Sequence, residues 1–159
     1  MAERLSARTN HHLYLAKLML RDMQHKLNHE SLPESLLLDA WGQAVVWHLR
    51  VTFQTLVKEL ADKARRDADQ VSAIMVSDDL DAIDNLPAEL RELATLQRSG
   101  WIADLMTASR EESPVAAKTV DPLSLTVVSN YHYGVDELTN WFKSFDDLID
   151  RFRESMVEC

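Results

Sequence analysis

The chain has little of the three residue types that shape turn-rich or cross-linked proteins. Its 159 residues include 3 glycines, 4 prolines and one cysteine, Cys159. So few glycines and prolines do not supply the many tight turns of a β-sandwich or a β-barrel. A lone cysteine excludes an internal disulfide and a zinc site built from several cysteines. Together with abundant leucine, alanine, glutamate and arginine, these scarcities predict an all-α protein.

Two further absences concern the membrane and nucleic acids. No stretch approaches about 18 consecutive apolar residues, the length that a membrane-spanning helix requires. Residues 1–9 contain no apolar core of a secretory signal, so we expect a cytoplasmic protein that does not associate with membranes. The net charge of −9 disfavours an extended phosphate-binding surface, because such surfaces depend on lysine and arginine. We therefore expect no nucleic-acid partner.

The sequence that remains predicts one helical domain over residues 1–159. We expect an up-and-down-like bundle of four to five helices around a long central helix at about 31–66, which is apolar on most of its circumference. Ser31 followed by Glu34 has the spacing of a capping box and predicts where this helix begins. The last helix, from about Val135 to Met156, has one apolar face. Between them, residues 112–134 contain two prolines and predict a long irregular segment.

The central helix carries two exceptions to its own pattern. Val46 and Trp47 lie within or beside its narrow polar stripe, where side chains exposed to water are expected. His48 lies near the middle of the broad apolar arc, where the core is expected to be dry. Both exceptions are candidates for function.

His48 also has a predicted neighbour on the first helix. If the first two helices fold back near residue 30, residues whose numbers add up to about 60 lie level, as His12 and His48 do. With Glu59 about three turns away along the central helix, they form a candidate site for a metal or an anionic group. The alternative is a pair of core histidines that bond to Thr52, Thr55 or a backbone carbonyl.

Other metal-site signatures are weak. The chain has no Glu-x-x-His motif of the kind that di-iron bundles use in pairs. His25 and His29 share a helix face, but no glutamate lies between them as the general base of a zinc protease motif does. We therefore predict no metal, no cofactor and no catalytic residue, which favours a protein that is not an enzyme.

Apolar residues outside the predicted core indicate a contact surface. Val46 and Trp47 on the central helix, with Tyr14 and Leu18 on the first helix, form a candidate interface. Either the 112–134 segment covers these residues, or another subunit does. An unidentified protein partner and a homodimer are both compatible with the second alternative.

Three strings in the chain resemble a known group of proteins. They are Arg8-Thr9-Asn10-His11-His12-Leu13-Tyr14-Leu15-Ala16, Asp84-Asn85-Leu86-Pro87-Ala88-Glu89-Leu90 and Arg98-Ser99-Gly100-Trp101-Ile102. Together they resemble a small family of uncharacterised helical proteins from pseudomonads and related bacteria. The resemblance implies a bacterial, cytoplasmic setting and transfers no functional residue.

These observations favour a non-enzymatic protein-interaction or regulatory module. The alternative is a helical bundle that binds a metal or a small molecule near His12 and His48.

Overall fold

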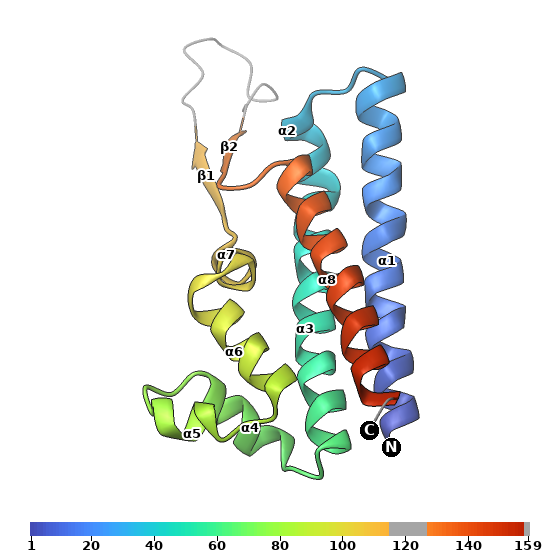
Figure 1. Ribbon diagram of the computed structural model, residues 1–159. Coiled ribbons are helices and arrows are strands. Elements are labelled where there is room, and N and C mark those ends of the chain that lie inside the picture. The colour runs from blue at the N-terminus through green and yellow to red at the C-terminus, as the bar shows by residue number, and fades with distance from the viewer. Residues whose placement is uncertain (115–126, 158–159) are drawn as a thin grey trace.

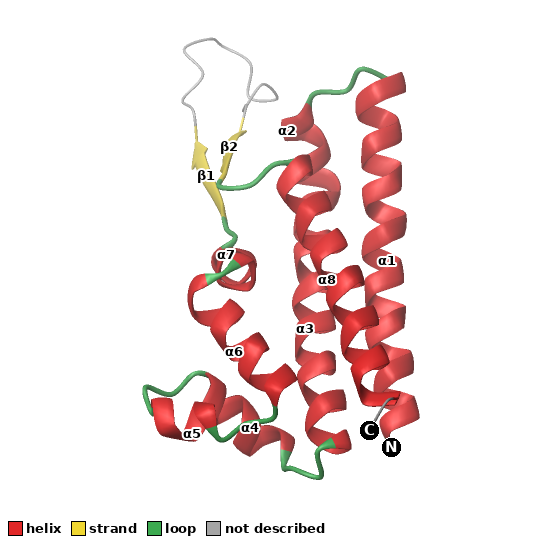
Figure 2. Ribbon diagram, in the orientation of Figure 1, coloured by secondary structure: helices red, strands yellow, loops and turns green. Residues whose placement is uncertain are grey.

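The computed structural model describes residues 1–114 and 127–157, and these form an all-α protein, as predicted. The elements in order are α1 (Ala2–His29), α2 (Glu34–Leu37), a π-helical turn η1 (Leu38–Gly42), α3 (Gln43–Lys63), α4 (Ala68–Met75), α5 (Leu80–Asp84), α6 (Ala88–Ser99), α7 (Trp101–Thr107), β1 (Arg110–Pro114), β2 (Val127–Tyr131) and α8 (Val135–Val157). Figure 2 shows that helices dominate and that the described strands form one short hairpin. No helix in the described ranges has both the length and the apolar character needed to cross a lipid bilayer.

The predicted central helix is present as α2, η1 and α3, which follow one another without a break from Glu34 to Lys63. Figure 1 shows α3 running beside α1 and α8, with α6 and α7 on its other side. This position explains why α3 is apolar on most of its circumference. The helix ends where Arg65 adopts a φ of 55°, a left-handed conformation that a right-handed helix cannot continue through.

The three long helices bury the apolar positions that their periodicity places on one side. These residues form a single core cluster, which includes Leu13, Ala16, Leu20 and Met23 of α1, Val45, Leu49, Leu56 and Leu60 of α3, and Leu138, Phe145, Leu148 and Phe152 of α8. Burial of such side chains is the main favourable contribution to folding.

The capping box predicted at Ser31 and Glu34 is wrong. Ser31 has a φ of 53°, and α2 begins only at Glu34, with no side-chain cap. The Glu34 carboxylate instead accepts a hydrogen bond from the backbone N–H of Val135, 2.7 Å away in the first turn of α8. Glu137 accepts the neighbouring N–H of Gly134 at 2.8 Å. Two carboxylates therefore satisfy two of the free donors at the start of α8.

Gly100 separates α6 from α7. A Cβ atom at this position would lie 3.0 Å from the Cα and 3.1 Å from the carbonyl oxygen of Leu96. Backbone atoms cannot move aside as a flexible side chain can, so the close approach of Gly100 to the last turn of α6 requires glycine here.

The interpretation of residues 112–134 as irregular is wrong at both ends of that segment. Arg110–Pro114 and Val127–Tyr131 pair as antiparallel strands, with Arg110 opposite Tyr131. Beyond the hairpin, the Tyr131 hydroxyl donates to the Asp39 carboxylate, and Tyr133 is buried near Gly42. These contacts with the central helix position the end of the segment. Residues 115–126 lie outside the described part of the chain.

Candidate functional site

The structure places His12 of α1 and His48 of α3 at the same level, in direct contact. Their Nδ1 atoms are 3.0 Å apart, which is hydrogen-bonding distance. Because neither nitrogen can be both donor and acceptor, one ring donates its Nδ1 proton and the other accepts it. The antiparallel arrangement of α1 and α3 thus produces the pair that the sequence spacing predicts.

Trp47 lies against both histidines. Its ring centroid is 4.8 Å from that of His48 and 5.5 Å from that of His12, and both contacts are edge-to-face. The His11 ring makes a further edge contact with His12, at 5.5 Å. The two exceptions of the central helix are therefore parts of one group of aromatic rings, which we name the Trp47 cluster: His11, His12, Trp47 and His48.

The cluster extends from the interior to the surface. His48 is buried and His12 is half-buried, whereas 55% of the Trp47 surface remains exposed. One part of the indole therefore packs against the imidazoles, and the other part exposes a large apolar surface to solvent. Exposed tryptophans of this kind are the residues most often found at the centre of protein interfaces.

The surroundings of the histidines disfavour their charged forms. Burial lowers the pKa of His12, and the positive charges of His48, His11 and Arg8 lower it further. Burial also lowers the pKa of His48, with a second contribution from His11. Both imidazoles are therefore held in the neutral state more firmly than a histidine in water.

The threonines predicted as alternative partners of the histidines bond elsewhere. The Thr52 hydroxyl donates to the carbonyl of His48 at 2.9 Å, and the Thr55 hydroxyl donates to the carbonyl of Val51 at 2.9 Å. Both bonds join a side-chain hydroxyl to a backbone carbonyl of α3, and the imidazoles bond to each other.

Glu59 does not join the histidine pair. Its carboxylate, with 0% exposed surface, lies 3.2–3.3 Å from the guanidinium of Arg153 and 3.3 Å from the ammonium of Lys63. Arg153 also donates to the side-chain oxygen of Asn10 at 2.7 Å. Glu59 therefore links α3 to α8, and through Arg153 to α1, as a structural ion-pair network.

The four predicted interface residues do not share one surface. Val46 is only 4% exposed and lines a small hollow with Ala108 and Tyr133, so the segment between α7 and α8 covers it. Tyr14 and Leu18 are 57% and 39% exposed and line a groove between α1 and α8. Trp47 of α3 is 55% exposed, contacts His12 of α1 and also lines the hollow beside Val46. Val46 is therefore not part of an exposed interface. Of the other three residues, Tyr14 and Leu18 lie on one surface and Trp47 lies on another.

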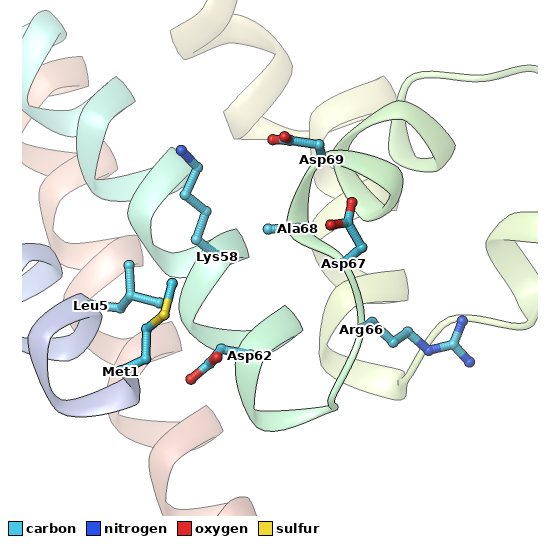
Figure 3. Close-up of a pocket in the computed structure, with 8 residues that line it drawn as sticks. All are labelled: Met1, Leu5, Lys58, Asp62, Arg66, Asp67, Ala68 and Asp69. Carbon is cyan, nitrogen blue, oxygen red and sulfur yellow. The ribbon is translucent and has the colours of Figure 1, made fainter.

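A further hollow lies at the other end of α1, near the start of α4. Its lining includes Lys58, Asp62 and Asp69, with Met1 and Leu5 at the edge. Figure 3 shows that these side chains do not converge on one point and that Arg66 extends away from the hollow. Arg66 donates to a backbone carbonyl, and Asp67 caps α4, so both have local structural roles. We assign no site there.

The predicted histidines are not grouped with further described side chains in the way that metal ligands are. Among the residues whose side chains the structure describes, no three His, Cys, Asp or Glu are grouped so that they could hold a metal ion. The rings of His25 and His29 are in edge contact, with centroids 4.6 Å apart at the exposed end of α1. Two imidazoles alone leave a tetrahedral metal site incomplete.

Several residues of interest were not singled out from the sequence. Arg50, half-buried on α3, donates to the carbonyls of Leu105, Met106 and Ala108 at 2.7–3.1 Å. Lys17 and Arg21 line the groove between α1 and α8. Their i, i+4 spacing beside Tyr14 and Leu18 is a sequence signal that could have revealed the groove.

These features define a class: an all-α protein with a central helix, a paired-histidine cluster beneath an exposed tryptophan, and a second groove between its terminal long helices. A comparison with known families then identifies the chain. It belongs to a family of unknown function, DUF6586, whose model matches residues 1–159. This confirms the predicted membership in an uncharacterised family. Among curated proteins and among solved structures, no match to the chain was found.

Proposed function

We propose that the protein is a non-enzymatic protein-interaction module that uses Trp47 as its main contact residue. The observation that carries this proposal is the 55% exposure of an indole that packs edge-on against two hydrogen-bonded imidazoles. A side chain already held in place loses less conformational entropy when a partner covers it. Burying the remaining apolar surface of Trp47 would then contribute directly to binding.

The chemistry of the cluster supports binding rather than catalysis. The two Nδ1 atoms bond to each other, so neither of these atoms is available to a substrate. Their lowered pKa values keep both rings neutral, which suits an interface that must be desolvated. The occupant is either an unidentified protein or a second copy of the chain.

The test compares Trp47→Ala with Leu80→Ala, which removes a 63% exposed side chain from α5. Each tagged variant and the wild type are purified from a lysate of the source cells, and co-purified proteins are quantified by mass spectrometry. Light scattering on a sizing column measures self-association in parallel. We expect a stoichiometric partner or a dimer with wild type and Leu80→Ala, and its loss with Trp47→Ala.

Recovery of the same partners with all three proteins would contradict the proposal. So would a wild-type protein that stays monomeric and recovers no partner. A photo-reactive amino acid at position 47 gives an independent readout, because cross-links formed there identify the protein that contacts this surface.

The paired imidazoles support a second candidate function, the binding of a metal or small molecule near His12 and His48. Elemental analysis of the native protein separates the two functions. A stoichiometric metal that is lost in His48→Ala would favour the second function over the first. A metal-free dimer that dissociates on Trp47→Ala would favour the first.

A further inference from the structure

The groove between α1 and α8 is lined by both apolar and basic side chains. Its volume is about 540 Å³, and Tyr14, Leu18 and Phe142 form its apolar lining. Lys17, Arg21 and Lys143 stand along it, two from α1 and one from α8. Gln24 donates to the Thr139 hydroxyl at 3.1 Å and joins the two walls. Figure 1 shows α1 and α8 side by side along this length.

The three cations of the groove lie close together in a chain that is acidic as a whole. The net charge is −9, and some other basic side chains bond to carboxylates, as Lys63 and Arg153 do with Glu59. Among the described residues, by contrast, Lys17, Arg21 and Lys143 form no ion pair. Three unpaired cations beside exposed apolar side chains are complementary to a ligand that is both acidic and apolar.

We propose that this groove binds an acidic amphipathic helix of a partner protein. Tyr14 and Leu18 lie one turn apart, as do Lys17 and Arg21, so α1 presents an apolar row beside a basic row. A third helix in the groove places its apolar stripe on Tyr14, Leu18 and Phe142, and its carboxylates reach the cations of both walls. This is the helix-in-groove mode of recognition.

This surface is distinct from the Trp47 cluster. Each residue advances by about 100° around an α-helix, so Tyr14 lies about 200° from His12 around the axis of α1. The two sites therefore face different directions, and either can exist without the other. The proposal for the groove goes beyond the proposed function.

The experiment uses two synthetic peptides of about 18 residues, long enough for a marginal helix in water. The first has leucine at the i, i+3, i+4 and i+7 positions and glutamate at most others. The second has the same leucines, with lysine in place of glutamate. Binding of each labelled peptide to the full-length protein is measured by fluorescence anisotropy at low and high salt.

The variants separate charge at the groove from charge in general. Lys17→Glu/Lys143→Glu reverses two groove cations, and Arg4→Glu/Lys58→Glu makes the same change in net charge at exposed positions outside the groove. Loss of two ion pairs and gain of two repulsions predict at least about tenfold weaker binding of the acidic peptide by the first variant. We expect the control variant and Trp47→Ala to bind it as the wild type does.

Salt distinguishes the two components of binding. At high salt, the wild-type affinity should approach that of Lys17→Glu/Lys143→Glu, because screening removes the advantage of the cations. Tyr14→Ala/Leu18→Ala should weaken binding at low and high salt alike, since it removes apolar contact. Circular dichroism melting curves confirm that each variant is folded.

Three outcomes would overturn the proposal: equal binding of the acidic and basic peptides, equal weakening by the groove variant and its control, or no binding of the acidic peptide. If the peptide does not bind but the protein self-associates and Lys17→Glu/Lys143→Glu dissociates it, the occupant is a second copy. If oleate binds to the groove and the peptide does not, the occupant is a lipid. If Trp47→Ala still binds the peptide but no longer binds the partner of the Trp47 cluster, the result supports both proposals and shows that the two sites are independent.

Discussion

The His12–His48 pair has a limited capacity for protons. With both rings neutral, or with one ring protonated, a single Nδ1 proton lies between the two nitrogens, 3.0 Å apart. Protonation of both rings would direct two N–H groups at each other across that distance and add electrostatic repulsion. The geometry and the burial of His48 therefore act in the same direction, toward a neutral pair.

The first prediction follows from the preference of the histidine pair for the neutral state. The pKa values of His12 and His48 are lowered in the folded state, so the unfolded chain, with a histidine pKa of about 6.5, binds more protons. This contribution to stability is fully present above about pH 6.5 and is lost as the pH falls toward the folded-state values. We expect the free energy of unfolding, measured with urea, to decrease between about pH 7.5 and about pH 5.5.

The control for this pH dependence uses another histidine. His48→Asn removes a member of the pair and should flatten the dependence, whereas His25→Asn, at an exposed position of α1, should retain it. A His48→Asn variant with the wild-type slope would show that other groups cause the decrease.

At the scale of elements, Arg50 holds two helices together. Its guanidinium, half-buried on α3, donates to three carbonyls at and beyond the end of α7. Carbonyls at the end of a helix lack the i+4 N–H partner of the inner turns, and the planar guanidinium can reach several of them at once. Arg50 therefore fixes the position of α7 and of the chain that leads into β1.

The second prediction concerns this contact. Arg50→Lys keeps the charge but cannot reproduce the three bonds, so we expect the free energy of unfolding to fall by about 1–2 kcal/mol. Arg4→Lys, at an exposed position of α1, is the matched control and should change it by less than about 0.5 kcal/mol. Chemical denaturation of both variants gives the comparison, and equal stabilities would contradict the assigned role.

The same elements show what the sequence can and cannot predict. The long helices and the level of His12 with His48 follow from a 3.6-residue period and a short reversal between helices, which are local properties. The role of Glu34 depends on a contact with Val135, 101 residues away, which no local pattern encodes. The sequence alone could not decide what covers Val46 for a similar reason, because the cover comes from the distant segment around Tyr133. Pairing of β1 with β2 likewise depends on residues distant in sequence.

Across the whole molecule, stability is expected to be uneven. The long helices share the apolar core, whereas the corner formed by α4 and α5 leaves Val76 and Leu80 mostly exposed. Hydrogen bonds from arginine side chains hold this corner in place, including one from Arg98 to the carbonyl of Ser77 at 2.8 Å. Segments with few buried contacts and exposed hydrogen bonds open more easily than the core does.

The third prediction is that amides of residues 77–85 exchange with deuterium much faster than those in the middle of α3. Arg98→Ala removes the bond to Ser77 and the ion pair with Asp78, so it should accelerate exchange in this corner further. Exchange in α1 should stay unchanged, because local opening of α5 leaves the core packed. Arg4→Ala, which removes an exposed arginine from α1, is the control and should leave the corner unaffected. If residues 77–85 were protected as strongly as α3, the corner would open only when the entire molecule unfolds.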